Sequence, residues 1–231
     1  MKIWALAAGI DDILEQHGDK ILKSKYDDVE NIPIDYIDIS IDTNHELKVY
    51  YKGMELELPD MFWPTISNTD ALVLENLLIN SGVKCAINLN EMSVARSKIA
   101  TYHRLRQNGI RVPKTMVFFK HPDKSIISEH FSYPFVMKPD NGFGGDGVSL
   151  IHNEAELDDY ISKQSYGVAY MAQEYISTSF GRDIRVVILN GEVFYSAMRC
   201  AGNPDEFRSN VHQGGTIEDI AIDETVKEYC E

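Results

Sequence analysis

The sequence lacks any apolar run that reaches the roughly 18 residues a membrane-spanning helix needs. Its first four residues, MKIW, lack the layout of a signal peptide. Cysteine is also scarce, since Cys85, Cys200 and Cys230 are odd in number, far apart and without metal-ligand spacing. These absences predict a cytoplasmic protein with reduced thiols, and they exclude a disulfide framework.

Positive charge is in short supply as well. The 231 residues contain 22 Lys and Arg against 36 Asp and Glu, which gives a net charge of −14. Such a field repels phosphate backbones and anionic lipid surfaces, so we expect neither nucleic acid nor membrane as a partner. The composition, 44% hydrophobic and 25% charged, is ordinary for a soluble globular protein and excludes disorder.

The first 90 residues or so have the pattern of a small α/β lobe. Apolar alternation predicts strands at 2–8, 34–39, 47–51 and 54–58, with a turn at Lys52-Gly53. A helix through residues 72–78 should end before Gly82, and a second helix should run from Ser93 to Gly109.

Residues 133–199 are rich in strand signals. Strands are expected at 133–138, 148–151, 171–176 and 184–199, with a helix capped by Asn153 and a hairpin turn at Asn190-Gly191. A two-residue turn pairs Leu189 with Glu192. It also places Asp183 opposite Met198 and Arg185 opposite Ser196, with Arg199 on the other face unless a bulge intervenes.

A glycine-rich loop follows Lys138. Gly142, Gly144 and Gly147 fit G-x-G-x-x-G, but a dinucleotide-binding loop requires a helix next, and residues 148–151 read as a strand. A Walker A loop is excluded because Lys138 precedes the glycines, and a protein kinase because H-R-D and D-F-G are missing. The remaining interpretations are a phosphate-binding loop between two strands or a surface hairpin with a solvated lysine.

Several motifs in fixed order resemble the ATP-grasp superfamily. They are Lys98 on a helix, GIRVPKT at 109–115, FVMKP at 135–139 and QEYI at 173–176. GRDIR at 181–185 and FRSNVHQGG at 207–215 resemble the RimK-like branch, the α-L-glutamate ligases. The resemblance covers residues 93–216, and motifs that agree in order are more specific than any one of them.

The resemblance implies an α/β fold with a pre-ATP-grasp lobe at 1–92 and two α+β subdomains that sandwich ATP, at 93–172 and 173–231. The second subdomain is expected to be incomplete, with a helix at 218–231. The implied activity is ATP-dependent joining of a carboxylate to an amine, with glutamate as the expected amino acid and an acyl phosphate as intermediate. The implied cofactors are ATP and Mg²⁺ or Mn²⁺, and the partners are an amino acid and a small-molecule or peptide carboxylate.

The resemblance also implies roles for individual residues. Arg208 and Asn210 would be catalytic, and Arg185 and Arg199 would contact the substrate. The expected nucleotide-binding residues are Lys98, Lys138, Gly142, Gly144, Gly145, Gly147, Gln173, Glu174, Tyr175, Ile176, Asp183, Arg208, Ser209 and Asn210. From the residues alone, Lys98 reads as a solvated helix residue, and Asp183 as a surface partner of Arg182 or Arg185.

The sequence departs from the family pattern in two places. Ser97 stands where the family usually has Asp, and no E-x-N metal motif follows Gly215. We therefore expect no metal ligands, weak ATP binding, no turnover by these residues alone, and an unfinished sheet prone to self-association. Turnover would point to Asp219, Asp223 or Glu224. Two alternatives remain: a truncated or degenerate nucleotide-binding protein without activity, and a peptide-crosslinking ATP-grasp ligase.

Overall fold

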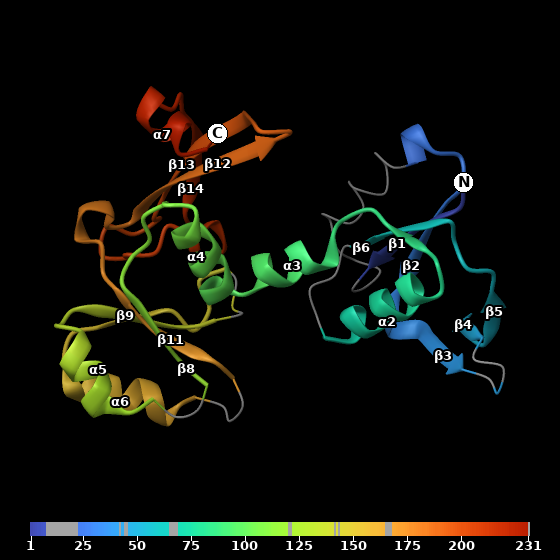
Figure 1. Ribbon diagram of the computed structural model, residues 1–231. Coiled ribbons are helices and arrows are strands. Elements are labelled where there is room, and N and C mark those ends of the chain that lie inside the picture. The colour runs from blue at the N-terminus through green and yellow to red at the C-terminus, as the bar shows by residue number, and fades with distance from the viewer. Residues whose placement is uncertain are drawn as a thin grey trace. The chain divides into compact units, whose positions relative to one another are not determined.

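The computed structural model describes residues 1–7, 23–41, 43, 46–64, 69–119, 122–140, 142, 144–164 and 168–230. The chain divides into two compact units, Met1–Arg96 and Ser97–Glu231 (Figure 1). The boundary predicted after residue 92 falls inside α3 (Leu89–Arg96), and the one predicted after residue 172 falls inside β11 (Tyr170–Glu174). Within the described ranges, no helix combines the length and the apolar character needed to cross a bilayer.

A parallel sheet in the order β2-β1-β6-β7 forms the centre of the first unit. The strands of this sheet are β1 (Ile3–Ala7), β2 (Val29–Pro33), β6 (Met61–Pro64) and β7 (Lys84–Cys85). Helix α2 (Thr69–Asn80) follows β6 in the sequence. Trp4 and Phe62 are fully buried and belong to one core with Leu74 and Leu78 of α2. The helix ends before Gly82 as expected. The strand predicted at 2–8 is present from Ile3 to Ala7, and Ala8 lies outside the described residues.

A three-stranded antiparallel sheet completes the first unit. It consists of β3 (Ile37–Ile41), β4 (Leu47–Tyr51) and β5 (Met54–Leu56). The predicted turn is confirmed, since Lys52 and Gly53 both have positive φ, at 50° and 79°. The strand predicted from residue 34 is wrong in its first half, because Ile34–Tyr36 forms a 3-10 turn. Pro33 precedes this turn, and a proline suits the start of a helical turn because that position needs no N–H donor.

The second unit contains an antiparallel sheet in the order β10-β9-β11-β8. Its strands are β8 (Thr115–Phe118), β9 (Phe135–Pro139), β10 (Ser149–Ile151) and β11 (Tyr170–Glu174). Helices α5 (Lys124–His130) and α6 (Glu154–Ser162) cover one face (Figure 1), and Asn153 caps α6 as predicted. Phe135 and Met137 point into that core, so the alternation of a strand directs Val136 and Lys138 to the opposite face.

Helix α4 (Lys98–Gln107) begins the second unit and ends before Gly109, as predicted. The single helix predicted to start at Ser93 is wrong, because α3 ends at Arg96 and α4 begins at Lys98. Ser97 between them has an extended backbone and caps α4. Ser97 Oγ accepts a hydrogen bond from Ala100 N, and it donates one to Asp140 Oδ2 at 2.8 Å. Asp140 Oδ1 accepts from Ile99 N at 2.9 Å. A carboxylate from the end of β9 thus anchors the start of α4.

A second antiparallel sheet contains β12 (Arg182–Leu189), β13 (Glu192–Cys200) and β14 (Thr216–Asp219). The Asn190-Gly191 turn pairs Leu189 with Glu192 as predicted, and both turn residues have positive φ. Ile188 still pairs with Val193, but Val187 pairs with Tyr195. The predicted pairs of Asp183 with Met198 and Arg185 with Ser196 are therefore wrong. This bulge leaves Phe194 unpaired and shifts every later pair by one residue.

The last described residues differ from expectation. The helix predicted at 218–231 is wrong, since β14 continues through Asp219 and α7 covers only Glu224–Glu228. Short 3-10 turns, η2 (Ser177–Ser179) and η3 (Val211–Gln213), complete the elements of this unit. Phe194 and Ile217 on the sheet of β12, β13 and β14 are 73% and 50% exposed, so this sheet presents apolar side chains at its surface. Self-association through it stays a prediction.

Candidate functional site

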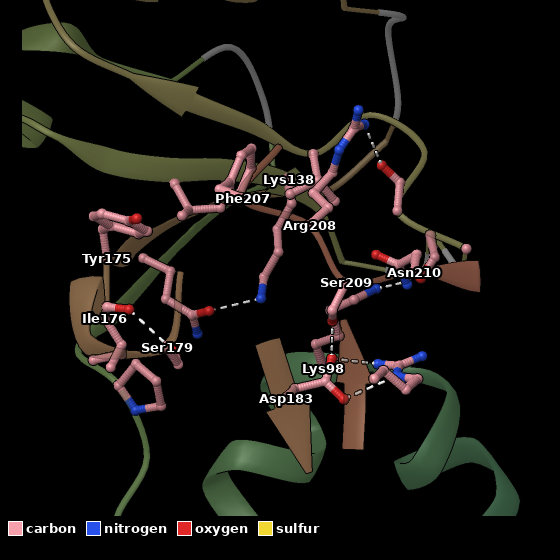
Figure 2. A pocket seen from close by; sticks show the side chains of 18 of the residues that line it. Lys98, Lys138, Tyr175, Ile176, Ser179, Asp183, Phe207, Arg208, Ser209 and Asn210 are labelled. Atoms are coloured by element: carbon pink, nitrogen blue, oxygen red, sulfur yellow. Dashed lines mark hydrogen bonds and ion pairs between the residues drawn. The ribbon is translucent and has the colours of Figure 1, made fainter. Parts of the chain in front are cut away.

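The second unit contains a cavity of about 660 Å³. It is lined by all the site residues predicted from the sequence except Gly147. Figure 2 shows Lys98, Lys138 and Asp183 among them. Tyr102, Arg182 and Phe207 also line it. Residues from α4, β9, the glycine loop, β11, β12 and β13 therefore meet at one place, although more than 100 positions separate the first from the last.

Two lysines enter the cavity from different elements. Lys98 stands at the start of α4, and its Nζ donates to the carbonyl oxygens of Asp140 and Gly142. Lys138 stands on the face of β9 that the core does not use. Burial lowers the pKa of Lys98, and the nearby charge of Lys138 lowers it further. Because like charges repel, an anion bound beside both ammonium groups would stabilise them.

The glycine loop contacts the segment 206–213. Arg208 Nη1 donates to the carbonyl of Gly145 at 3.2 Å, while Glu206 accepts from Arg208 Nε and Nη2 at 2.9 and 2.8 Å. The hydrogen bonds between Glu206 and Arg208 lower the pKa of the carboxyl and raise that of the guanidinium. Gly145 has a φ of +89°, and a Cβ built there would lie 2.7 Å from Asn210 Oδ1. Only glycine fits this approach without displacing its neighbour.

Gly145→Val should therefore weaken ATP binding by about tenfold or more, because the side chain strains the loop and displaces Asn210 from the cavity wall. The matched control is Gly53→Val, since Gly53 has a φ of +79° but nothing within 4 Å of its added Cβ. Isothermal titration of both variants with ATP measures the difference. Equal affinities in the two variants would show that the contact with Asn210 does not shape the site.

Asp183 and Arg199 form an ion pair on neighbouring strands. Because of the bulge, Asp183 pairs directly with Arg199, whose Nε and Nη2 donate at 2.8 and 2.6 Å. Ser209 Oγ also donates to the Asp183 carboxylate. Burial raises the pKa of Asp183, but the hydrogen bonds from Arg199 and Ser209 outweigh it and hold the pKa below its ordinary value. The partner of Asp183 is thus Arg199, where the sequence pointed to Arg182 or Arg185.

The other end of the cavity is aromatic. The rings of Tyr175 and Phe207 meet edge to face with centroids 6.3 Å apart, and Ile176 beside them is 41% exposed (Figure 2). Glu174 is held by Lys114, the residue before β8, because Glu174 Oε2 accepts from Lys114 N at 3.1 Å and the Glu174 N–H donates to the Lys114 carbonyl. This end offers flat apolar surface of the kind that a nucleobase requires.

The carboxylates of the cavity do not fit a metal site. Among the described residues, no three His, Cys, Asp or Glu side chains gather as metal ligands. Glu174 and Asp183 accept from protein donors as described, and Asp146 Oδ1 accepts from Gln213 Nε2 at 3.4 Å. We therefore assign no residue to the Mg²⁺ or Mn²⁺ that the resemblance implies. The absence of turnover by these residues alone stays a prediction.

The two sheets and the glycine loop define the ATP-grasp class of fold. A crystal structure of a RimK domain ATP-grasp protein from Sphaerobacter thermophilus superposes with a TM-score of 0.71 at 15% identity, over 99% of this chain and 79% of that chain. The ATP-grasp ligase PsnB, complexed with a precursor variant, Mg and ADP, gives a TM-score of 0.62 at 17% identity, over 99% and 79%. The predicted fold class is confirmed.

Residues 95–230 match the family model of the RimK-like ATP-grasp domain, and the chain belongs to that family. A probable alpha-L-glutamate ligase of Methanococcoides burtonii is 32% identical over 185 residues, which cover 78% of this chain and 61% of the relative. The chain thus spans about 61% of the length of that curated relative. The predicted family is confirmed.

The structure also adds residues that the sequence did not assign. Tyr102 lies within the helix predicted up to Gly109 and received no role from the sequence, yet its hydroxyl accepts from Lys138 Nζ at 3.2 Å. Thr115 belongs to a quoted motif but received no role, and it hydrogen-bonds to Gln173. No signal in the sequence marks either contact, because both depend on which strands and helices become neighbours.

Proposed function

We propose that this chain is the nucleotide-binding part of an ATP-dependent carboxylate–amine ligase of the α-L-glutamate ligase type. One observation carries the proposal: Lys98, Lys138 and Arg208, from three separate elements, converge on one cavity that ends at the aromatic pair Tyr175 and Phe207. A cationic end and a flat apolar end suit a nucleoside triphosphate.

The cationic end fits the phosphates. Among the described residues, six Lys and Arg side chains line the cavity against three Asp and Glu, in a chain whose net charge is −14. Local positive charge against a negative background favours an anionic ligand at this place. Gly144 and Gly145 allow the backbone to approach phosphate oxygens, and Asn210 adds a neutral side-chain amide beside them.

The proposed reaction moves negative charge between oxygens. A carboxylate oxygen of the substrate bonds to the γ-phosphorus of ATP while the bond from that phosphorus to the β–γ bridging oxygen breaks, which releases ADP. An amine then displaces phosphate from the acyl carbon and loses a proton. Lys98, Lys138 and Arg208 would stabilise the charge that develops on the phosphate oxygens, because fixed cations need little rearrangement during the reaction.

Arg185 is the better of the two proposed substrate contacts. Arg199 lies in the cavity but is held by Asp183, whereas Arg185 lines the cavity and forms no ion pair within the described part of the chain. An arginine is suited to bind a carboxylate in a bidentate way. We therefore assign the substrate carboxylate to Arg185.

Arg185→Met should weaken L-glutamate binding by about five- to tenfold in the presence of a non-hydrolysable ATP analogue, because one charge-assisted hydrogen-bond donor is lost. Isothermal titration with glutamate measures the effect. Arg111→Met is the matched control, since Arg111 is exposed and does not line the cavity. Equal affinity in Arg185→Met and wild type would remove Arg185 from the site. No glutamate binding to the wild type would contradict the glutamate assignment.

A further inference from the structure

A series of hydrogen bonds leads from β8, the edge strand of the sheet β10-β9-β11-β8, to Lys138. Gln173 on β11 pairs with Thr115 on β8 and with Val136 on β9. Lys138 stands two residues after Val136, and side chains two residues apart on a strand share a face. Gln173 and Lys138 are therefore diagonal neighbours on the cavity face, where long side chains can meet.

The direction of each hydrogen bond in this series is fixed. Thr115 Oγ1 donates its one hydrogen to the Pro113 carbonyl at 2.9 Å, so it can only accept from Gln173 Nε2 at 2.8 Å. The Gln173 amide nitrogen therefore donates to Thr115, and the amide oxygen accepts from Lys138 Nζ at 2.6 Å. The reversed amide would place N–H donors against an ammonium group. Gln173 is 7% exposed, so bulk water is a poor substitute for either partner.

These hydrogen bonds place no negatively charged acceptor against Lys138. The ammonium group has three N–H donors, of which one is held by Gln173 Oε1 and one by the Tyr102 hydroxyl at 3.2 Å. The third remains for an oxygen in the cavity. Both protein acceptors are neutral, whereas a carboxylate at either place would pair with Lys138 and compete with an anionic ligand.

We propose that Gln173 and Thr115 are positioning residues that orient the Lys138 ammonium group toward a phosphate of the nucleotide. The proposal rests on the proposed function, because it takes Lys138 to contact phosphate. Thr115 acts through Gln173, and Gln173 acts through Lys138. The role expected for Gln173 from the family resemblance was nucleotide binding, and this inference gives its buried side chain a different task.

The test is a double-mutant cycle on the full chain. Thr115→Val keeps the shape of the side chain and removes the hydroxyl, so the Gln173 amide loses its fixed orientation. We expect about three- to tenfold weaker ATP binding by isothermal titration and unchanged binding of adenosine, which has no phosphate. Thr115→Ser keeps the hydroxyl and should restore most of the affinity. In the Lys138→Met background, Thr115→Val should have no further effect.

Each outcome decides something. If Thr115→Val weakens ATP and adenosine equally, or acts equally with and without Lys138, its role is structural and the proposal is wrong. If Lys138→Met leaves ATP affinity unchanged, Lys138 does not contact a phosphate. Both this inference and the proposed role of Lys138 in nucleotide binding are then wrong. If only Lys138→Met has an effect, the inference alone fails.

Gln173→Glu gives a second variant in case Thr115→Val does not fold. The new carboxylate should pair with Lys138 and weaken ATP binding by at least tenfold at low salt, with adenosine affinity unchanged. Unchanged or stronger ATP binding in Gln173→Glu would contradict the proposal, because a charged acceptor would then not compete with phosphate.

Discussion

Lys138→Met is expected to weaken ATP binding by about ten- to a hundredfold, because a charge-assisted hydrogen bond contributes about 1.5 to 3 kcal/mol. Methionine keeps the length and the apolar stem of lysine but removes the charge. Lys138 lies on the cavity face of β9, so its removal leaves the core on the other face intact. Isothermal titration gives the affinity, and a thermal melt shows whether the fold is retained.

The control for Lys138→Met is Lys163→Met, which changes the net charge equally. The Lys163 side chain is 68% exposed on the end of α6, pairs with Asp159 at 2.6 Å, and does not line the cavity. Its loss should change ATP affinity by less than about twofold, because long-range effects of an exposed charge are screened. If the two variants bind ATP equally, the effect of Lys138 is one of net charge and not of contact.

Phe135→Ala should produce the largest loss of stability. Phe135 is 1% exposed and stands on the core face of β9, with Phe131 at a ring distance of 5.8 Å and Tyr133 at 5.3 Å. Truncating a buried phenylalanine leaves a cavity and lowers the free energy of unfolding by about 3 to 5 kcal/mol. Chemical denaturation followed by circular dichroism measures this change.

The matched control for Phe135→Ala is Phe119→Ala, because Phe119 is 78% exposed. That substitution should change the free energy of unfolding by less than about 0.5 kcal/mol. Where Phe135→Ala remains folded, its ATP affinity should be close to that of the wild type, since the side chain points away from the cavity. A large fall in affinity with little loss of stability would contradict the assignment of the two faces of β9.

Local signals in the sequence predicted much of the fold. The turns at Lys52-Gly53 and Asn190-Gly191 and the cap at Asn153 each depend on residues a few positions apart. The strand after the glycine loop is present as β10, which supports the exclusion of a dinucleotide-binding helix. The site residues predicted from the ordered motifs line one cavity, with the exception of Gly147. Their individual roles stay proposals.

The errors arise where distant residues decide the geometry. The break at Ser97 depends on Asp140, more than 40 positions away, whose carboxylate accepts from Ser97 and Ile99. No glycine at Phe194 signals the bulge in the sequence. The bulge shifts the register by one residue, so Arg199 lies opposite Asp183 and on the same face, where the prediction without a bulge placed it on the other face. The link from Thr115 to Gln173 requires the order of strands in the sheet, which a single sequence does not specify.

The central claim is that the cavity binds a nucleoside triphosphate through its phosphates, and a ligand series tests it most directly. ATP, ADP, AMP and adenosine would each be titrated calorimetrically into the 231-residue chain at low and at high salt. We predict one site per chain, an affinity that falls in the order ATP, ADP, AMP, adenosine, and the greatest loss at high salt for ATP. Equal affinity for ATP and adenosine, or no saturable binding of ATP, would contradict the claim.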